Sequence, residues 1–248
     1  MAFKVNKTAV VSNAQYIDLS SFSLHLEGEK VDAEKLQSRS LHERLISKIS
    51  TKPTAMKKYN EAFNTETFHL DRERIYLLPF KVTLDTKLKE FQYKILHRIC
   101  YTNDMLFKFR IVDSPLCYFC GEEIETLEHF FFLCERVRTF WKELNTILKS
   151  QKITSSSFDV KDVIFGLFHP ENNSILVNYI ILEIKYFIYR SKLNKTSLST
   201  PILLTKCKKT YQIERFIARK NNKLYLHNKK WEPFISLMEQ LLSPPRRT

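Results

Sequence analysis

The stretch at residues 117–134 reads CYFCGEEIETLEHFFFLC and holds three of the five cysteines in the 248-residue chain. Cys117, Cys120, His129 and Cys134 follow the pattern Cys-x2-Cys-x8-His-x4-Cys. Three thiolates and one imidazole at short spacing suit a tetrahedral Zn²⁺ site, and four protein ligands leave no open position for catalysis. We therefore predict that these four residues bind a structural zinc ion. The alternative is that the cysteines are ordinary buried thiols and that the histidine lies at the surface.

Apolar residues recur at steps of three and four from Leu127 to Leu148. This spacing predicts a long helix that runs to about residue 150, with Cys134 on its apolar stripe. Thr126 is placed to cap the start of this helix, where glutamates would be favoured by the helix dipole. The metal site is therefore expected at the start of a helix.

A second helix is predicted at residues 83–101, because its apolar residues recur at the spacing of one helix face. Lys87, Lys94 and Arg98 cluster beside this stripe. A basic edge of this kind can follow a nucleic-acid backbone, since Lys and Arg displace the counterions condensed on phosphates. The alternative is a solvated flank whose long side chains reach into water. The stripe itself consists of Leu84, Leu88, Phe91, Ile95 and Ile99.

The chain contains only three glycines and many Leu, Ile, Lys and Glu residues, which favours helices over hairpin-rich β structure. We predict a mainly α fold: a helical domain with one small zinc-stabilised loop-helix module and a possible short β or irregular N-terminal segment. Further helices are predicted at residues 31–49, 54–63, 175–193, 202–219 and 224–242. Four regions are expected: a poorly defined N-terminal segment (1–30), a helical lead-in with the basic helix (31–110), the zinc-binding module with its long helix (111–150), and a basic helical C-terminal region (151–248).

The formal net charge is +13 at pH 7, and most of it lies in the C-terminal quarter. Residues 182–248 hold 15 lysines and arginines against four glutamates, whereas residues 114–140 hold two arginines against five glutamates. We therefore expect the zinc module to stabilise the fold, and the basic helices on either side of it to bind an anionic partner. Nucleic acid fits this distribution of charge. The candidate nucleic-acid-binding residues are Lys87, Lys94, Arg98, Lys108, Arg110, Arg136, Arg138, Lys206, Lys208, Lys209 and Arg215.

No stretch of about twenty residues, the length of a membrane-spanning helix, is free of charged side chains. The N-terminus also lacks the apolar core of a signal peptide. We therefore expect an intracellular protein, in the nucleus or the cytoplasm, with reduced cysteines and no membrane partner.

Four pieces of the sequence occur together in one order: IYLLPFKVTLDTKLKEFQYKILHRI (75–99), DSPLCYFC (113–120), ETLEHFFFLC (125–134), and Phe140 with Trp141. Together they resemble the zinc-binding region near the C-terminus of one protein family, the LINE-type (non-LTR) retrotransposon reverse transcriptases. The resemblance covers about residues 70–150 and continues more loosely toward the C-terminus. It implies that the three cysteines and the histidine are the zinc ligands, and that the region binds element RNA and target DNA.

Polymerase chemistry requires clustered carboxylates that hold two metal ions, and in the parent family one such cluster is a Tyr/Phe-x-Asp-Asp turn. The eight aspartates of this chain are scattered, and no two are adjacent. We therefore expect no enzyme activity, and we interpret the chain as the C-terminal piece of a retroelement protein that grips RNA, DNA or both. Its expected partners are nucleic acid and the remainder of that protein. The alternative function is a helical protein-interaction module whose zinc site is purely structural.

Overall fold

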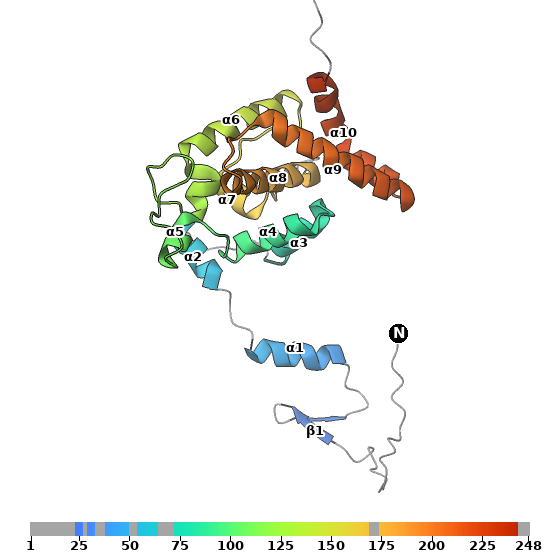
Figure 1. The fold of residues 1–248 in the computed structure, drawn as a ribbon. Coiled ribbons are helices and arrows are strands. Elements are labelled where there is room, and N and C mark those ends of the chain that lie inside the picture. Colours follow the sequence, from blue (N-terminus) through green and yellow to red (C-terminus); the bar gives the residue numbers. More distant parts are fainter. Residues whose placement is uncertain are drawn as a thin grey trace, which may run out of the picture. The chain divides into compact units, whose positions relative to one another are not determined.

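The computed structural model describes residues 23–26, 29–32, 38–49, 54–63, 72–168 and 174–242. The chain divides into two compact units, Met1–Lys52 and Pro53–Thr248, which are described separately (Figure 1). Most of the predicted N-terminal segment, residues 1–22 and 27–28, lies outside the described residues. The four regions predicted from the sequence stay a prediction.

The first unit contains a short hairpin and one helix. Strands β1 (Ser23–Leu26) and β2 (Glu29–Asp32) pair antiparallel, with Ser23 opposite Asp32. The expected short β segment is therefore present. Helix α1 (Ser38–Ile49) is shorter than the helix predicted at residues 31–49, because residues 31–32 pair in the hairpin.

The named elements of the second unit are all helices, as the sequence predicts, and irregular segments such as residues 109–126 join them. A single π-helical turn, η3, lies in its middle and carries part of the metal site. The elements are α2 (Thr54–Phe63), α3 (Arg72–Val82), α4 (Thr86–Leu96), α5 (Asn103–Lys108), η3 (His129–Leu133), α6 (Glu135–Ser150), α7 (Val160–Phe165), α8 (Ser174–Leu193), α9 (Thr200–Lys220) and α10 (Leu224–Leu242).

Helix α8 runs through the middle of this unit and is packed by α3, α4, α7, α9 and α10 (Figure 1). It is apolar around most of its circumference, which is the pattern of a buried helix rather than of a surface one. Val177, Ile181, Ile184 and Ile188 have no exposed area. The core of the second unit is therefore built around α8.

The basic helix predicted at residues 83–101 is shorter in the structure, where α4 spans Thr86–Leu96. It begins late because the Asp85 carboxylate accepts a hydrogen bond from the Lys87 backbone N–H at 2.8 Å and so caps the helix. It ends early because Arg98 adopts a left-handed φ of 54°. Of the predicted stripe, Leu88, Phe91 and Ile95 are buried, while the two residues beyond the helix ends, Leu84 and Ile99, are exposed.

No helix in the described part of the chain is long and apolar enough to span a membrane.

Candidate metal centre

Cys117 and Cys120 lie in a tight turn that is closed by backbone hydrogen bonds. The Cys117 N–H donates to the Glu123 carbonyl and the Gly121 N–H donates to the Cys117 carbonyl, both at 2.8 Å. Gly121 has a φ of 72°, a conformation that glycine adopts without the steric cost of a side chain. The turn therefore presents the two thiols on one side of a short loop.

His129 and Cys134 are the first residue of η3 and the residue that follows it. The Thr126 hydroxyl accepts from the His129 N–H at 3.2 Å, which confirms the predicted cap. The Cys134 N–H donates to the His129 carbonyl at 2.8 Å and closes a turn of π-helical spacing.

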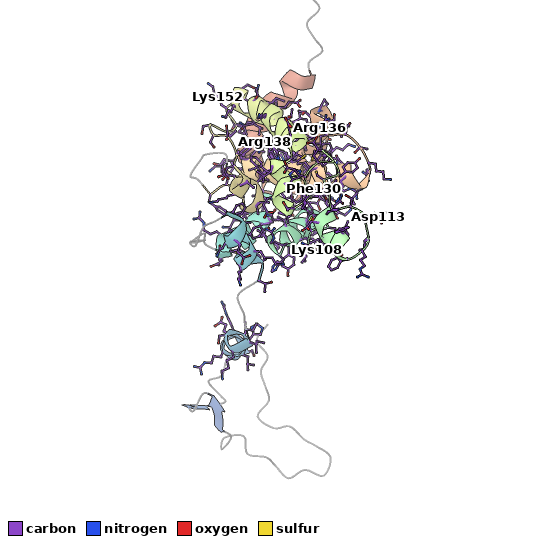
Figure 2. All side chains as sticks on the ribbon, turned by 90° about the vertical axis from the view of Figure 1, so that its left-hand side faces the viewer. Lys108, Asp113, Phe130, Arg136, Arg138 and Lys152 are labelled. Carbon is purple, nitrogen blue, oxygen red and sulfur yellow. The ribbon has the colours of Figure 1, made fainter. Side chains whose placement is uncertain are left out.

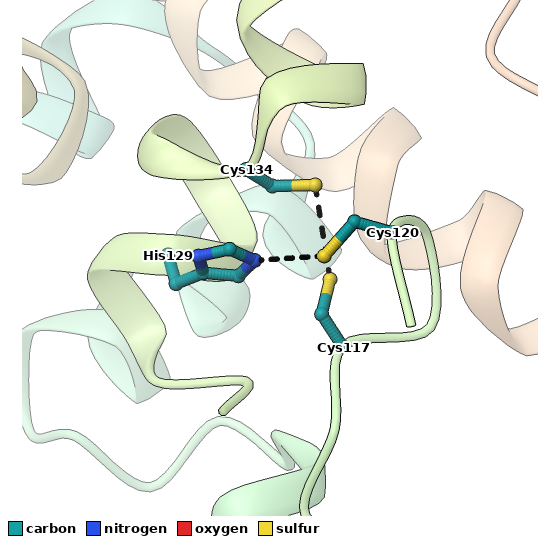
Figure 3. A group of neighbouring side chains, drawn as sticks. All are labelled: Cys117, Cys120, His129 and Cys134. Carbon is teal, nitrogen blue, oxygen red and sulfur yellow. Dashed lines mark hydrogen bonds between the residues drawn. The ribbon is translucent and has the colours of Figure 1, made fainter. Parts of the chain in front are cut away.

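The long helix predicted from Leu127 to residue 150 is wrong in one respect, because it is interrupted at Cys134. This residue has extended backbone angles (φ −54°, ψ 129°), and α6 begins at Glu135. In a straight α-helix, residues five apart point about 140° away from each other. The π turn and the break bring the Cys134 thiol to the same side as the His129 ring (Figure 3).

The four ligand atoms lie within 4.8 Å of one another. The Cys117 and Cys134 sulfurs are 3.8 Å apart, and the Cys120 sulfur is 3.4 Å from His129 Nε2 (Figure 3). Tetrahedral zinc with Zn–S of about 2.3 Å and Zn–N of about 2.0 Å places sulfurs about 3.8 Å apart and sulfur and nitrogen about 3.5 Å apart. The arrangement therefore fits one zinc ion, and Cys117, His129 and Cys134 are buried.

Backbone N–H groups face each of the three sulfurs. The donors come from the second and third residues after each cysteine: Phe119 and Cys120, Glu122 and Glu123, and Arg136 and Val137. Hydrogen bonds to the charged form of a group favour that form. The loop is thus arranged to receive thiolates, the form in which cysteine binds zinc.

The pKa values of the thiols reflect a balance between burial and these donors. Burial raises the pKa of Cys117 and of Cys134 above the usual range. Burial also disfavours ionisation of Cys120, but its backbone donors and the His129 ring outweigh that effect and lower its pKa to about 7. The other ring nitrogen, His129 Nδ1, lies 3.0 Å from a Glu123 carboxylate oxygen. A carboxylate at this position orients a zinc-bound imidazole.

Two of the glutamates around the site are held by cations inside the fold. Glu125 has no exposed area and accepts hydrogen bonds from the Asn103 and Tyr118 N–H groups, at 2.7 and 2.8 Å, and from the Lys192 ammonium group of α8. Glu128 is bound through both oxygens by the Arg98 guanidinium group. The negative charge counted from the sequence is therefore partly neutralised by residues that are distant in the chain.

The candidate nucleic-acid-binding residues are distributed over several helices of the second unit. Arg98 is committed to Glu128, and Lys94 and Lys108 form exposed ion pairs with Glu90 and Asp104. Lys206 lies 5.0 Å from the centre of the Phe187 ring. The remaining candidates are exposed or half-buried without a charged partner in the described part of the chain: Lys87, Arg110, Arg136, Arg138, Lys208, Lys209 and Arg215.

Figure 2 labels three of these cations, which lie at different places on the second unit. Arg136 and Arg138 are both on α6, and Lys108 of α5 lies away from them. The structure therefore does not gather all of the predicted residues into one patch. Sequence reasoning missed Lys192, which fastens the metal loop to α8, because nothing in its own segment indicates a partner 67 residues away.

Residues 57–141 match the model of a protein family described as zinc-binding in reverse transcriptase. No curated protein matches the chain. The matched segment contains all four ligands, and together with their geometry it identifies a structural zinc site in a region associated with reverse transcriptases. The resemblance of this segment to a zinc-binding region of reverse transcriptases is therefore confirmed, while the class of retroelement stays a prediction.

Proposed function

We propose that this chain is a zinc-stabilised nucleic-acid-binding region of a non-LTR retrotransposon reverse transcriptase, and that it holds element RNA, target DNA or both. The zinc-binding region at residues 57–141 is the premise of this proposal. Zinc shapes the loop and η3, and basic side chains elsewhere on the second unit hold the phosphates. In this proposal the chain carries out no polymerase or endonuclease step.

The outer face of α9 is the observation that carries the proposal. The inner side of this helix is buried through Leu203, Leu204 and Cys207. Its one carboxylate, Glu214, is also buried and accepts hydrogen bonds from Lys230 and Trp231 at 2.8 Å. The solvent side of α9 therefore presents cations with no carboxylate of its own helix among them, and phosphates are attracted to such a face. These cations are Lys208, Lys209, Arg215, Arg219 and Lys220.

Apolar side chains are interleaved with these cations. Ile213 and Phe216 are each 60% exposed, and the Lys220 ammonium group lies 5.0 Å from the centre of the Phe216 ring. Aromatic side chains within a basic groove stack with unpaired bases, which adds affinity without requiring a particular sequence. This combination favours single-stranded RNA or DNA as the ligand.

The metal site supports the proposal that the chain catalyses no polymerase or endonuclease step. Four protein ligands complete the zinc tetrahedron, whereas catalytic zinc keeps a position for water. Within the described residues, this is the one cluster of Cys, His, Asp and Glu side chains suited to a metal. Extension of a primed template by this chain alone would overturn this part of the proposal.

The second candidate function is a protein-interaction module. It is favoured by the segment that begins at the end of α5, where Phe107, Phe109 and Ile111 are 45%, 61% and 65% exposed. Exposed apolar side chains that lie close together often mark protein-binding surfaces.

The two candidates are separated by binding of the full chain to single-stranded RNA and to nicked DNA over a series of salt concentrations. We expect affinity to fall with salt. The double variant Arg215→Gln/Arg219→Gln should weaken binding at least about tenfold and reduce the salt slope by about 0.7 per lost phosphate contact. The matched control Lys57→Gln/Lys142→Gln removes two exposed cations of α2 and α6 and should change little. Binding that is immeasurable at low salt, or independent of salt, would contradict the proposal.

A further inference from the structure

A cavity of about 170 Å³ lies between α4 and α8, away from the zinc ligands. Its aromatic wall is formed by Phe91, Tyr101, Tyr186 and Tyr189. The Phe91 ring is 5.2 Å from each of the rings of Tyr186 and Tyr189, so these three side chains support one another. Tyr101, which also lines the cavity, is 55% exposed. The cavity therefore offers flat aromatic surfaces that solvent can reach.

The rim of the cavity is positively charged. Lys87, Lys94 and Arg190 line it together with one carboxylate, Glu90, which leaves an excess of two positive charges. Lys94 and Glu90 form an ion pair at 2.7 Å, but both side chains are substantially exposed, at 43% and 65%. An exposed pair of this kind contributes little to stability and can be exchanged for another anion.

Size and chemistry restrict the ligand. The cavity is smaller than the sites of drug-sized ligands, which begin at about 300 Å³. A flat ring system packs against aromatic side chains, and a phosphate binds beside lysine and arginine. A base reaches such a cavity only when it is unpaired and unstacked. The Tyr189 hydroxyl group, like that of any tyrosine, is protonated at neutral pH and is able to donate a hydrogen bond to a base edge.

We propose that this cavity holds one unpaired nucleotide of a single-stranded nucleic acid, with the base against the tyrosines and the adjoining phosphates on Lys87, Lys94 and Arg190. The inference rests on the proposed function and adds a defined base-binding site to it. Arg190 becomes a nucleic-acid contact that the sequence did not suggest, because α4 and α8 are far apart in the chain and meet only in the folded unit.

The test uses two short oligonucleotides with the same backbone and the full-length chain. One is abasic at every position, and the other carries a single 2-aminopurine at its centre. Because the second strand has only one base, it cannot slide along the protein to place a different base in the cavity. We expect the single base to strengthen binding about tenfold, consistent with stacking of one base, and its fluorescence to change on binding.

Variants locate the base in the cavity. Tyr101→Ala and Tyr189→Leu should each remove most of the gain from the single base while leaving affinity for the abasic strand unchanged. Tyr225→Ala is the matched control, because this tyrosine is 76% exposed on α10 and does not line the cavity. Glu90→Gln should strengthen binding of both strands two- to threefold, since it removes the one carboxylate of the rim.

The outcomes separate this inference from the proposed function. If the abasic strand binds and the single base adds nothing, or if Tyr101→Ala and Tyr189→Leu both retain the full gain, the base-binding site is wrong and the proposed function stands. If neither strand binds at low salt, the proposed function fails and this site fails with it. A 4-thiouridine in place of the 2-aminopurine should crosslink to the peptide that contains Tyr101 or to the one that contains Tyr189, and crosslinks elsewhere alone would overturn the site.

Discussion

Arg98 joins three segments of the second unit through one side chain. Its guanidinium group holds Glu128, the neighbour of the zinc ligand His129, with one hydrogen bond at 3.1 Å and a second that is shorter. The same group lies 4.6 Å from the centre of the Tyr59 ring of α2, and the Tyr59 hydroxyl donates to the Ile95 carbonyl of α4 at 2.7 Å. The metal loop is thus fastened to α2 and α4 by residues that bind no metal.

We predict that Arg98→Gln lowers the free energy of unfolding by about 3 kcal/mol, because removing one partner leaves the other charge buried and unpaired. The Arg98 and Glu128 side chains are only 18% and 9% exposed. The matched control is Lys108→Gln, whose ion pair with Asp104 is exposed and should change stability by less than about 1 kcal/mol. Urea denaturation measures both variants.

Equal stability of the two variants would contradict this prediction. If the Arg98→Gln variant were fully stable but bound nucleic acid more weakly, Arg98 would be a nucleic-acid contact, as the sequence predicts.

The contrast between Arg98 and the zinc ligands shows what sequence can predict at this scale. The four ligands lie within 18 residues, so their spacing alone indicates the site. The partner of Arg98 is 30 residues away and lies beyond an irregular loop. A side chain beside an apolar helical stripe is expected to be exposed only if no segment from elsewhere in the chain packs over it. Local chemistry was therefore predictable, and pairing of charges across the fold was not.

Among the elements, α8 combines an apolar surface with buried polar groups. Asn178, Glu183 and Lys185 have at most 6% of their area exposed. The Asn178 amide bonds the backbone N–H and carbonyl of Leu167, at 2.7 and 2.8 Å, and so fixes the segment after α7. The Lys185 ammonium group donates to Gln92 of α4 at 2.5 Å. Burial lowers the pKa of Lys185 to about 7 and raises that of Glu183 to about 7.

The low pKa of Lys185 predicts a dependence of stability on pH. Between pH 7 and its ordinary value of 10.5, Lys185 is deprotonated in the folded state but protonated in the unfolded chain. The unfolded state then binds more protons, so stability rises with pH, by at most about 1.4 kcal/mol per unit. We expect wild type to gain about 2 kcal/mol relative to Lys185→Met from pH 7 to pH 9.

Urea denaturation at pH 7, 8 and 9 measures this difference. Titration of Glu183 and of the unchanged cysteines is common to both proteins and largely cancels. Lys142→Met, at an exposed position of α6, is the control and should parallel wild type at all three values. A constant difference between wild type and Lys185→Met would show that Lys185 keeps its ordinary pKa.

Helix prediction succeeded where apolar spacing was regular and failed where a special backbone feature intervened. The bounds of α2 and α10 are those predicted, and α8 and α9 differ from prediction by two residues or fewer at each end. Helix α3 was missed because it contains Pro79, a residue that usually ends a helix. The break at Cys134 was missed because the apolar stripe continues across it with unchanged spacing.

At the scale of the whole second unit, the metal site and the core share residues. Phe130 and Phe131 of η3 have no exposed area, and the indole N–H of Trp141 on α6 donates to the Phe131 carbonyl at 2.8 Å. The Phe131 ring contacts Phe91 of α4, the residue that also supports the cavity wall. The zinc loop and the helices α4, α6 and α8 thus share one hydrophobic core. No local pattern in the sequence predicts this contact.

This continuity leads to a prediction about removal of the metal. Chelation of zinc should lower the stability of the second unit by at least about 4 kcal/mol, the effect of a ligand present at 1,000 times its dissociation constant. Since η3 belongs to the core, we expect one cooperative transition that moves to lower temperature, rather than separate melting of the zinc loop. Calorimetry with and without a zinc chelator measures the shift, and added Zn²⁺, but not Mg²⁺, should reverse it.

A matched pair of cysteine variants tests the same coupling without a chelator. Cys134→Ser should lose bound zinc by elemental analysis and reproduce the lowered transition. Cys207→Ser changes a thiol that is also buried but lies on α9 outside the cluster, so it should keep its zinc and lose only the about 1–3 kcal/mol expected for a buried hydroxyl group. Hydrogen exchange then reports where the metal acts: the amides of α8 should lose protection together with those of η3, because the two elements are held to one core through Lys192 and Glu125. Two separate transitions, with α8 still protected after zinc is removed, would mean that the zinc loop folds independently of the helices around it.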